Sequence, residues 1–234
     1  MLINLKHRSE EAEIMDDLES SGEVIDQTLQ ELDVINRLLG GNHLSIQGLK
    51  HLLKKEHPQP ITLLDLGCGG GDILILMAKW ARKNQFDIRF IGIDANPHIV
   101  AYAEKNCSEF PEISFQCLNI FSPEFQALQC DILHASLFTH HFTQTELIDL
   151  FQVFKKQARL GIIINDLHRH FLAYYSIKWL THFFSKSEMV KYDAALSVAR
   201  GFRKKELMQI LNATNIQNYQ LHWKWAFRWK LIIG

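Results

Sequence analysis

The sequence predicts an α/β fold in which a doubly wound, largely parallel sheet lies between layers of helices. From residue 61 to residue 165, short apolar strand-like runs alternate with segments whose apolar residues recur at helical spacing. A glycine-rich turn follows the first strand-like run, at the edge where parallel sheets bind ligands. With 234 residues, 47% of them hydrophobic, the chain can bury one such core and carry an appended segment.

Helical segments are expected before the alternation. Residues 10–39 are acidic at first and then apolar at helical intervals, up to the pair Gly40-Gly41. Residues 45–55 predict a short helix, and a proline-rich join leads to the first strand. The elements predicted next are strand 61–66, helix 72–83, strand 88–93, helix 97–107, strand 113–118, helix 123–128, strand 131–136, helix 144–156 and strand 160–165.

The pattern changes after the fifth strand. Residues 166–200 interrupt the alternation, a helix is expected over 204–214, and residues 217–233 give two strand-like segments. The expected units are an N-terminal helical cap over residues 1–57, a ligand-binding domain over 58–234, and a lid insertion within it at about 167–203.

The glycine-rich turn carries the most specific chemistry of the chain. Gly67, Gly69 and Gly71 let the backbone turn tightly and approach a ligand at the start of the next helix. Asp72 stands where a dinucleotide fingerprint has its third glycine, and Asp65 precedes the turn. Carboxylates there would repel a pyrophosphate but suit an ammonium and a sulfonium, which favours S-adenosylmethionine over NAD.

The second strand ends at Asp94, whose carboxylate can accept hydrogen bonds from both ribose hydroxyls. With this acidic residue and the acidic-x-Gly-x-Gly-x-Gly pattern, residues 61–234 resemble the class I S-adenosylmethionine-dependent methyltransferase family. The resemblance implies a Rossmann-like sheet whose terminal hairpin adds an antiparallel strand. It places these residues against the cofactor: Asp65, Gly67, Cys68, Gly69, Gly71, Asp94, Ala95, Asn119, Ile120 and Ser136.

Asn119 departs from that family, which commonly has an aspartate there to bind the adenine amino group. Its side-chain carbonyl can accept the same hydrogen bond, although an asparagine at this place is also ordinary turn chemistry.

Two polar clusters are candidates for contact with the methyl acceptor. His140 and His141 follow the fourth strand, similar to the histidine pair of many small-molecule methyltransferases, and His141 is the candidate general base. Asp166 and His168, after the fifth strand, rank beside it. The alternatives are that the histidines pack or cap a helix, and that Asp166 is a helix cap.

The lid insertion suggests an acceptor class. Residues 171–184 include six aromatic residues, so we expect them to roof the pocket of a flat or lipophilic acceptor, or else to complete the core or a dimer interface. Residues 193–202 resemble a stretch of bacterial methyltransferases of phenolic and polyketide-derived compounds. Asp193, Ser197 and Arg200 would there contact the acceptor or pin the lid.

The resulting hypothesis is methyl transfer from S-adenosylmethionine to a small hydrophobic acceptor, with phenolic O-methylation favoured. A quinone or ring-carbon methyltransferase would share every motif. A non-catalytic S-adenosylmethionine-binding scaffold or regulatory subunit is the alternative of another class.

Composition and charge limit the partners and the location that we expect for the protein. The formal net charge of -1 gives no basic excess for nucleic acid. Four cysteines without C-x-x-C or zinc spacing predict no metal site and a reducing, cytoplasmic location. The charged N-terminus lacks the apolar region of a signal peptide, and no apolar run is long enough to span a membrane. Peripheral membrane contact and a homodimer stay open.

Overall fold

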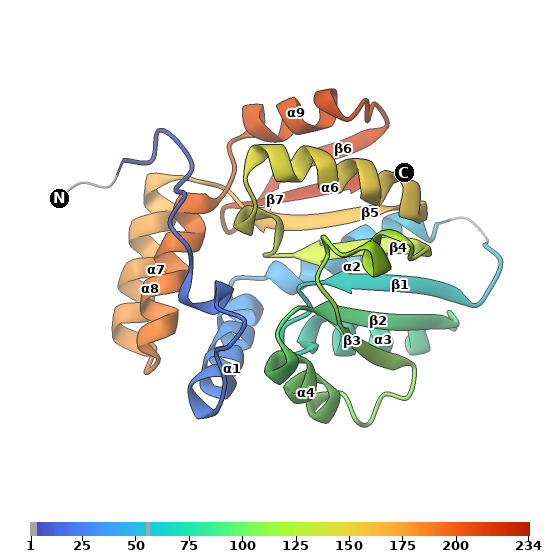
Figure 1. Cartoon of the computed structure of the whole chain (residues 1–234), viewed down its shortest axis with the longest axis horizontal. Helices are drawn as coiled ribbons and strands as arrows, with labels where there is room; N and C mark the ends of the chain where they lie inside the picture. The colour runs from blue at the N-terminus through green and yellow to red at the C-terminus, as the bar shows by residue number, and fades with distance from the viewer. Residues whose placement is uncertain (1–3, 55–56) are drawn as a thin grey trace.

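The computed structural model describes residues 4–54 and 57–234. It is built on a seven-stranded sheet with the order β3-β2-β1-β4-β5-β7-β6 (Figure 1). Strands β1 to β5 run parallel, and β7 pairs antiparallel with both β5 and β6. The strands are β1 (Ile61–Leu66), β2 (Ile88–Asp94), β3 (Ile113–Cys117), β4 (Cys130–Ser136), β5 (Ala158–Leu167), β6 (Tyr219–Lys224) and β7 (Arg228–Ile233). The predicted Rossmann-like sheet with a terminal hairpin is confirmed.

Helices cover both faces of this sheet. One hydrophobic core joins the sheet to α6 and α9, and a second core on the other face joins it to α2 and α3. The helices are α1 (Glu23–Leu38), α2 (Gly41–Leu52), α3 (Asp72–Lys83), α4 (Pro97–Asn106), α5 (Pro123–Gln126), α6 (Gln144–Gln157), α7 (Phe171–Phe184), α8 (Glu188–Arg200) and α9 (Lys204–Ala213), with short 3-10 turns η1 (Ile14–Asp16) and η2 (Thr139–His141). No described helix combines the length and the apolar character needed to cross a bilayer.

The parallel register brings the functional ends of the strands to one edge. Asp65 on β1 lies level with His134 on β4, and Ser136 at the end of β4 lies level with Asn165 on β5. The loops that follow β1, β2, β4 and β5 therefore meet at the carboxyl edge of the sheet, where such folds bind ligands.

The N-terminal region differs from the prediction. Only η1 is helical between residues 4 and 22, and α1 begins at Glu23 rather than near residue 10. Gly40 adopts a left-handed conformation with φ +71, so the next helix begins at once at Gly41 instead of at residue 45. The predicted end of that helix at Lys55 lies outside the described residues. Packing of α2 on β5 and β7 ties this region to the sheet, and the division at residue 58 stays a prediction.

The insertion after β5 forms two helices, α7 and α8, which lie side by side at one end of the sheet (Figure 1). The inner helix α8 is largely buried and also packs against α1 and η1. The outer helix α7 buries only Ala173 and Thr181.

Candidate functional site

The glycine turn after β1 has the geometry that its sequence predicts. Gly67, Gly69 and Gly71 have φ values of +61, +51 and +76, a conformation that favours glycine. A side chain at Gly67 would also overlap the ring of Phe138. The turn therefore needs glycine both for its backbone conformation and for the close approach of the loop after β4.

A cavity of about 630 Å³ opens beside this turn. That volume falls within the range of small-molecule sites. The predicted cofactor residues that line it are Asp65, Gly67, Cys68, Gly69, Asp94, Ala95, Asn119, Ile120 and Ser136.

Gly71 is the one predicted cofactor residue that does not line the cavity. It is the N-cap of α3, and a side chain there would meet Cys107 and Phe115. Its role is to turn the chain into the helix.

Asp65 offers an acceptor for a positively charged group. It is 1% exposed, and its Oδ1 lies 2.6 Å from His134 Nδ1, whose Nε2 lies 2.8 Å from Ser45 Oγ. Its Oδ2 has no hydrogen-bond partner within the described part of the chain. A buried carboxylate oxygen without a partner is costly, and an ammonium such as that of S-adenosylmethionine would satisfy it.

Two further residues suit the nucleoside. Asp94 ends β2 with its Oδ1 accepting the Asn96 N–H at 3.0 Å, and burial raises the pKa of Asp94. The Oδ1 of Asn119 accepts the Phe121 N–H at 2.9 Å, so this side chain stabilises the local turn. A carbonyl oxygen has a second lone pair for an adenine amino group. These residues fit the cofactor that the sequence implies, and their individual roles stay predictions.

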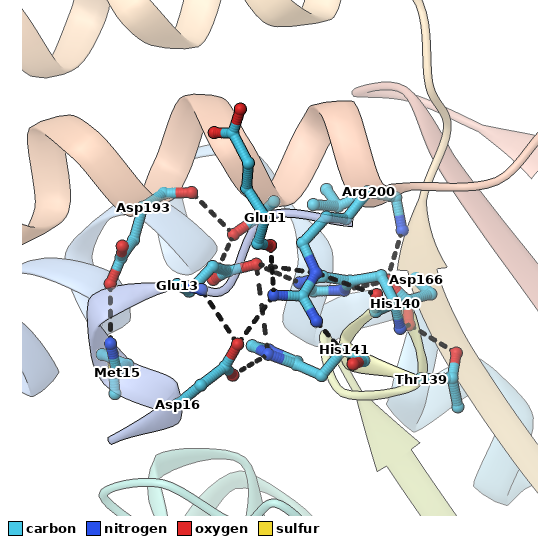
Figure 2. Close-up of polar contacts among 12 residues, drawn as sticks. Glu11, Glu13, Met15, Asp16, Thr139, His140, His141, Asp166, Asp193 and Arg200 are labelled. Atoms are coloured by element: carbon cyan, nitrogen blue, oxygen red, sulfur yellow. Dashed lines mark hydrogen bonds and ion pairs between the residues drawn. The ribbon is translucent and has the colours of Figure 1, made fainter. Parts of the chain in front are cut away.

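The two histidines of η2 also line the cavity and lie in a network of polar contacts (Figure 2). His140 is buried, and its Nδ1 lies 2.6 Å from Asp166 Oδ1, while its Nε2 faces Glu13 Oε1 at 3.5 Å. Burial alone would lower the pKa of His140, but the two carboxylates outweigh it and raise that pKa to about 9. His140 is therefore a protonated bridge between two acids.

His141 lies in a different environment. It lines the cavity, and its Nδ1 lies 2.5 Å from Asp16 Oδ1. Burial would raise the pKa of Asp16, but the contacts with His141 and Arg200 hold that pKa well below its ordinary value. An ionised Asp16 fixes the proton on His141 Nδ1 and leaves Nε2 as an acceptor, the arrangement of a carboxylate-oriented general base.

Arg200 joins the N-terminal segment to this loop. Its Nη1 donates to Asp16 Oδ2 at 2.7 Å and to the Glu11 carbonyl at 2.9 Å, and its Nη2 donates to the His141 carbonyl at 2.5 Å. Arg8 adds hydrogen bonds to the carbonyls of His140 and Phe142, both at 2.8 Å.

Two other α8 residues hold the same segment. Asp193 accepts the backbone N–H groups of Ile14 and Met15 at 2.8 and 3.0 Å, and Ser197 donates to Glu13 at 2.7 Å. The sequence predicted that Asp193, Ser197 and Arg200 either contact the acceptor or pin the lid. The observed contacts agree with the second role, because they hold α8 against the N-terminal segment.

Glu13, His140 and His141 form the group that could hold a metal ion, since one ligand atom from each lies within 4.8 Å of the others. Glu13 Oε1 and His140 Nε2, which lie 3.5 Å apart, have no hydrogen-bond partner in the described part of the chain.

The other two predicted acceptor residues, Asp166 and His168, do not line this cavity, and their roles stay predictions. Asp166 is 1% exposed and lies behind His140, where it also accepts the Thr139 hydroxyl at 2.5 Å, so it orients His140 and does not line the cavity. His168 lines a separate cavity of about 540 Å³ and accepts the Trp223 Nε1–H at 3.1 Å. No cavity-lining residue comes from α7, so its aromatic residues do not roof the pocket.

Sequence reasoning missed Glu13 and Asp16. Their only signal is an acidic N-terminal stretch, which is usually a solvated surface. Their place in the site depends on α8, which lies more than 170 residues further along the chain.

Known proteins resemble this chain over most of its length. A carboxy-S-adenosyl-L-methionine synthase of Campylobacter jejuni is 26% identical over 209 residues, which cover 83% of this chain and 85% of that protein. The enzyme of the same name from Helicobacter pylori strain P12 is 23% identical over 191 residues, with 76% of each chain covered.

Solved structures share the fold. Human N-acetylserotonin methyltransferase in complex with S-adenosylmethionine superposes with a TM-score of 0.64 at 13% identity, over 92% of this chain and 56% of that one. The plantazolicin methyltransferase BpumL, in complex with a desmethyl-plantazolicin analogue and S-adenosylhomocysteine, gives 0.60 at 20% identity over 86% and 73%.

The family described as methyltransferase domain matches residues 59–215, which include the glycine turn, Asp94 and the histidine pair. The two solved structures contain S-adenosylmethionine and S-adenosylhomocysteine, and the residues that line the cavity suit the same nucleoside. The chain therefore belongs to the methyltransferase domain family and is an S-adenosylmethionine-dependent enzyme.

Proposed function

We propose that the enzyme methylates a hydroxyl group of a small hydrophobic acceptor, with a phenol as the favoured class. The observation that carries this proposal is the pair of His141 and Asp16 at the cavity wall, which supplies a general base with its free nitrogen available to an acceptor. Apolar residues line another part of the cavity. They are Leu18, Leu29, Leu32, Ile99, Phe138, Phe142 and Leu167.

In this mechanism S-adenosylmethionine supplies a methyl group already activated by the sulfonium charge. The protein aligns the acceptor oxygen with that methyl, and alignment can contribute roughly 7 to 11 kcal/mol. His141 accepts the acceptor's proton at Nε2, and the Asp16 carboxylate stabilises the imidazolium that results. The segment held by Arg200 and Asp193 covers the site and excludes water.

The charge of the cavity supports a neutral acceptor. Arg200 is the single Lys or Arg among its described lining residues, and four of the five N–H donors of its guanidinium are bonded to protein groups. A carboxylate acceptor would meet uncompensated negative charge. The lining carboxylates are Glu10, Glu13, Asp16, Asp33, Asp65, Asp72, Asp94, Glu146 and Asp193.

A second candidate is the synthesis of carboxy-S-adenosylmethionine, which the names of the Campylobacter and Helicobacter relatives favour. Such a product carries an added carboxylate, which needs a cationic partner. Arg200 has a single N–H left for such a carboxylate, which supports methyl transfer as the first candidate. Ring-carbon methylation would use the same cavity and differ in the acceptor atom.

Product analysis separates these functions. The enzyme is incubated with S-adenosylmethionine carrying a labelled methyl group and a panel of phenols, quinols and carboxylic acids, and the products are identified by mass spectrometry. We expect labelled methyl ethers and S-adenosylhomocysteine. A nucleoside heavier by one carboxyl group would show carboxy-S-adenosylmethionine synthesis instead.

The role of His141 is tested with His141→Ala. We expect kcat to fall about 10²- to 10⁴-fold while the Kd for S-adenosylmethionine stays nearly constant. A loss confined to cofactor affinity would show that His141 only packs under the cofactor.

A further inference from the structure

Helix α7 presents a large apolar face to solvent. The members of this outer face are Phe171, Leu172, Tyr175, Trp179, Phe183 and Phe184. Trp179, Phe183 and Phe184 are 63%, 61% and 75% exposed. Soluble monomers rarely expose contiguous aromatic surface of this kind, so the outer face indicates a binding partner.

Neither the core nor the active site uses this face. The opposite side of α7, with Ala173 and Thr181, is buried and packs toward α8. It is α8 that lines the active-site cavity, through residues such as Asp193 and Ser197. The aromatic side chains of the outer face therefore point away from both.

The charges on and beside the outer face are basic. Lys178 and His182 are both exposed, and their spacing of four residues places them along the same side of the helix. The sequence from residue 168 to residue 187 contains no Asp or Glu. The second cavity continues this pattern at the start of α7, where Phe171 lies with Arg203, Lys204 and Lys205.

The β6–β7 turn extends the aromatic surface beyond the helix. Phe227 stacks on His170 with ring centroids 5.2 Å apart, and His170 lies 4.8 Å from Phe171. Trp225, which is 72% exposed, lies 6.1 Å from Phe227. Aromatic rings thus run from the turn onto α7 without a break.

We propose that the outer face of α7 docks on an anionic lipid surface, with its aromatic side chains in the headgroup region and the neighbouring lysines and arginine against the lipid phosphates. Amphipathic helices with aromatic and basic residues bind membrane interfaces in this way. A second copy of the chain is a poorer partner, because the two outer faces would bring like charges together without acidic partners from α7. The proposal does not depend on the identity of the acceptor.

Vesicle flotation tests the proposal with the full-length protein. We expect it to float with phosphatidylglycerol-containing vesicles, to bind pure phosphatidylcholine vesicles weakly, and to be released as salt is raised. Equal binding to both vesicle types, or no flotation with anionic vesicles, would overturn the proposal.

Two variants test the face itself. Trp179→Ser combined with Phe183→Ser should lower the partition coefficient at least about tenfold. Lys178→Glu changes the charge by two units and should lower it about 25-fold. The matched controls are Leu38→Ser on α1 and Lys83→Glu on α3, which alter exposed side chains of other helices and should bind like the wild type.

All four variants change exposed side chains, so their melting temperatures should match the wild type. Gel filtration with light scattering tests the alternative that the outer face is a subunit interface. A dimer that the Trp179 and Phe183 variant dissociates would overturn the proposal and assign the face to a subunit interface. Tighter binding to a single-stranded oligonucleotide than to anionic vesicles would overturn it as well.

Discussion

Asp16→Asn is a nearly isosteric change that isolates the orientation of His141. In the wild type, Asp16 Oδ1 accepts from His141 Nδ1, while Oδ2 accepts from Arg200 Nη1 at 2.7 Å and from the Glu13 N–H at 2.9 Å. An asparagine keeps its oxygen toward these two donors, because an amide nitrogen cannot accept from them. Its NH₂ group must then donate to His141 Nδ1.

That reversal moves the imidazole proton to Nε2, where it blocks acceptance of a proton from the acceptor. We expect kcat to fall about 10²- to 10⁴-fold, which is the range of general-base catalysis. The Kd for S-adenosylmethionine should change less than about threefold, because Asp16 does not belong to the predicted cofactor contacts.

Steady-state kinetics with the preferred acceptor and calorimetry with S-adenosylmethionine measure the two quantities. The exposed neighbour Asp17 supplies the control, and Asp17→Asn should leave both unchanged. If Asp16→Asn retained kcat within about threefold, the orientation argument would be refuted.

Two further predictions concern the cofactor and the buried histidine. Asp94→Ala should raise the Kd for S-adenosylmethionine about 100-fold or more while the melting temperature is retained, because charge-assisted hydrogen bonds contribute about 1.5 to 3 kcal/mol each; micromolar binding in calorimetry would contradict this. The pKa of His140 is raised from 6.5 to about 9. The protonated imidazole therefore stabilises the fold fully below pH 6.5, and this stabilisation is lost as pH rises through 9. Urea unfolding should show a loss of roughly 3 kcal/mol over that interval, and His140→Gln should flatten it; an equal slope in both proteins would refute the assignment.

The sequence predicted the parts of the fold that local patterns determine. The glycine turn follows from residues adjacent in the chain, since each glycine adopts a conformation that its lack of a side chain permits. The strands and helices between residues 61 and 165 follow from apolar periodicity, with ends shifted by one or two residues. Nine of the ten predicted cofactor contacts reach the cavity because they lie at the ends of parallel strands.

The acceptor end was less predictable because long-range contacts create it. Glu13 and Asp16 enter the site only through hydrogen bonds from α8 and η2. Asp166 and His168 are two residues apart but serve different surroundings, because Asp166 still belongs to β5 whereas His168 lies past its end and bonds to the terminal hairpin. No local pattern distinguishes these two environments.

The orientation of α7 is a third case. Helical spacing places Phe171, Tyr175 and Trp179 along one side of α7. It could not show which side of the helix meets α8, because Ala173 and Thr181 make the close contact and the larger residues stay outside. Hydrophobicity predicted a covered segment, as a pocket roof, core or dimer interface, and within this chain only the small residues are covered.

A crystal structure with S-adenosylhomocysteine and a bound phenol would test the central claim most directly. The account predicts ribose hydroxyls at Asp94, the ammonium at Asp65, and the phenol oxygen within hydrogen-bond distance of His141 Nε2 on the side that faces the sulfur. A phenol bound away from His141, or a sulfur that faces away from the histidine pair, would contradict it.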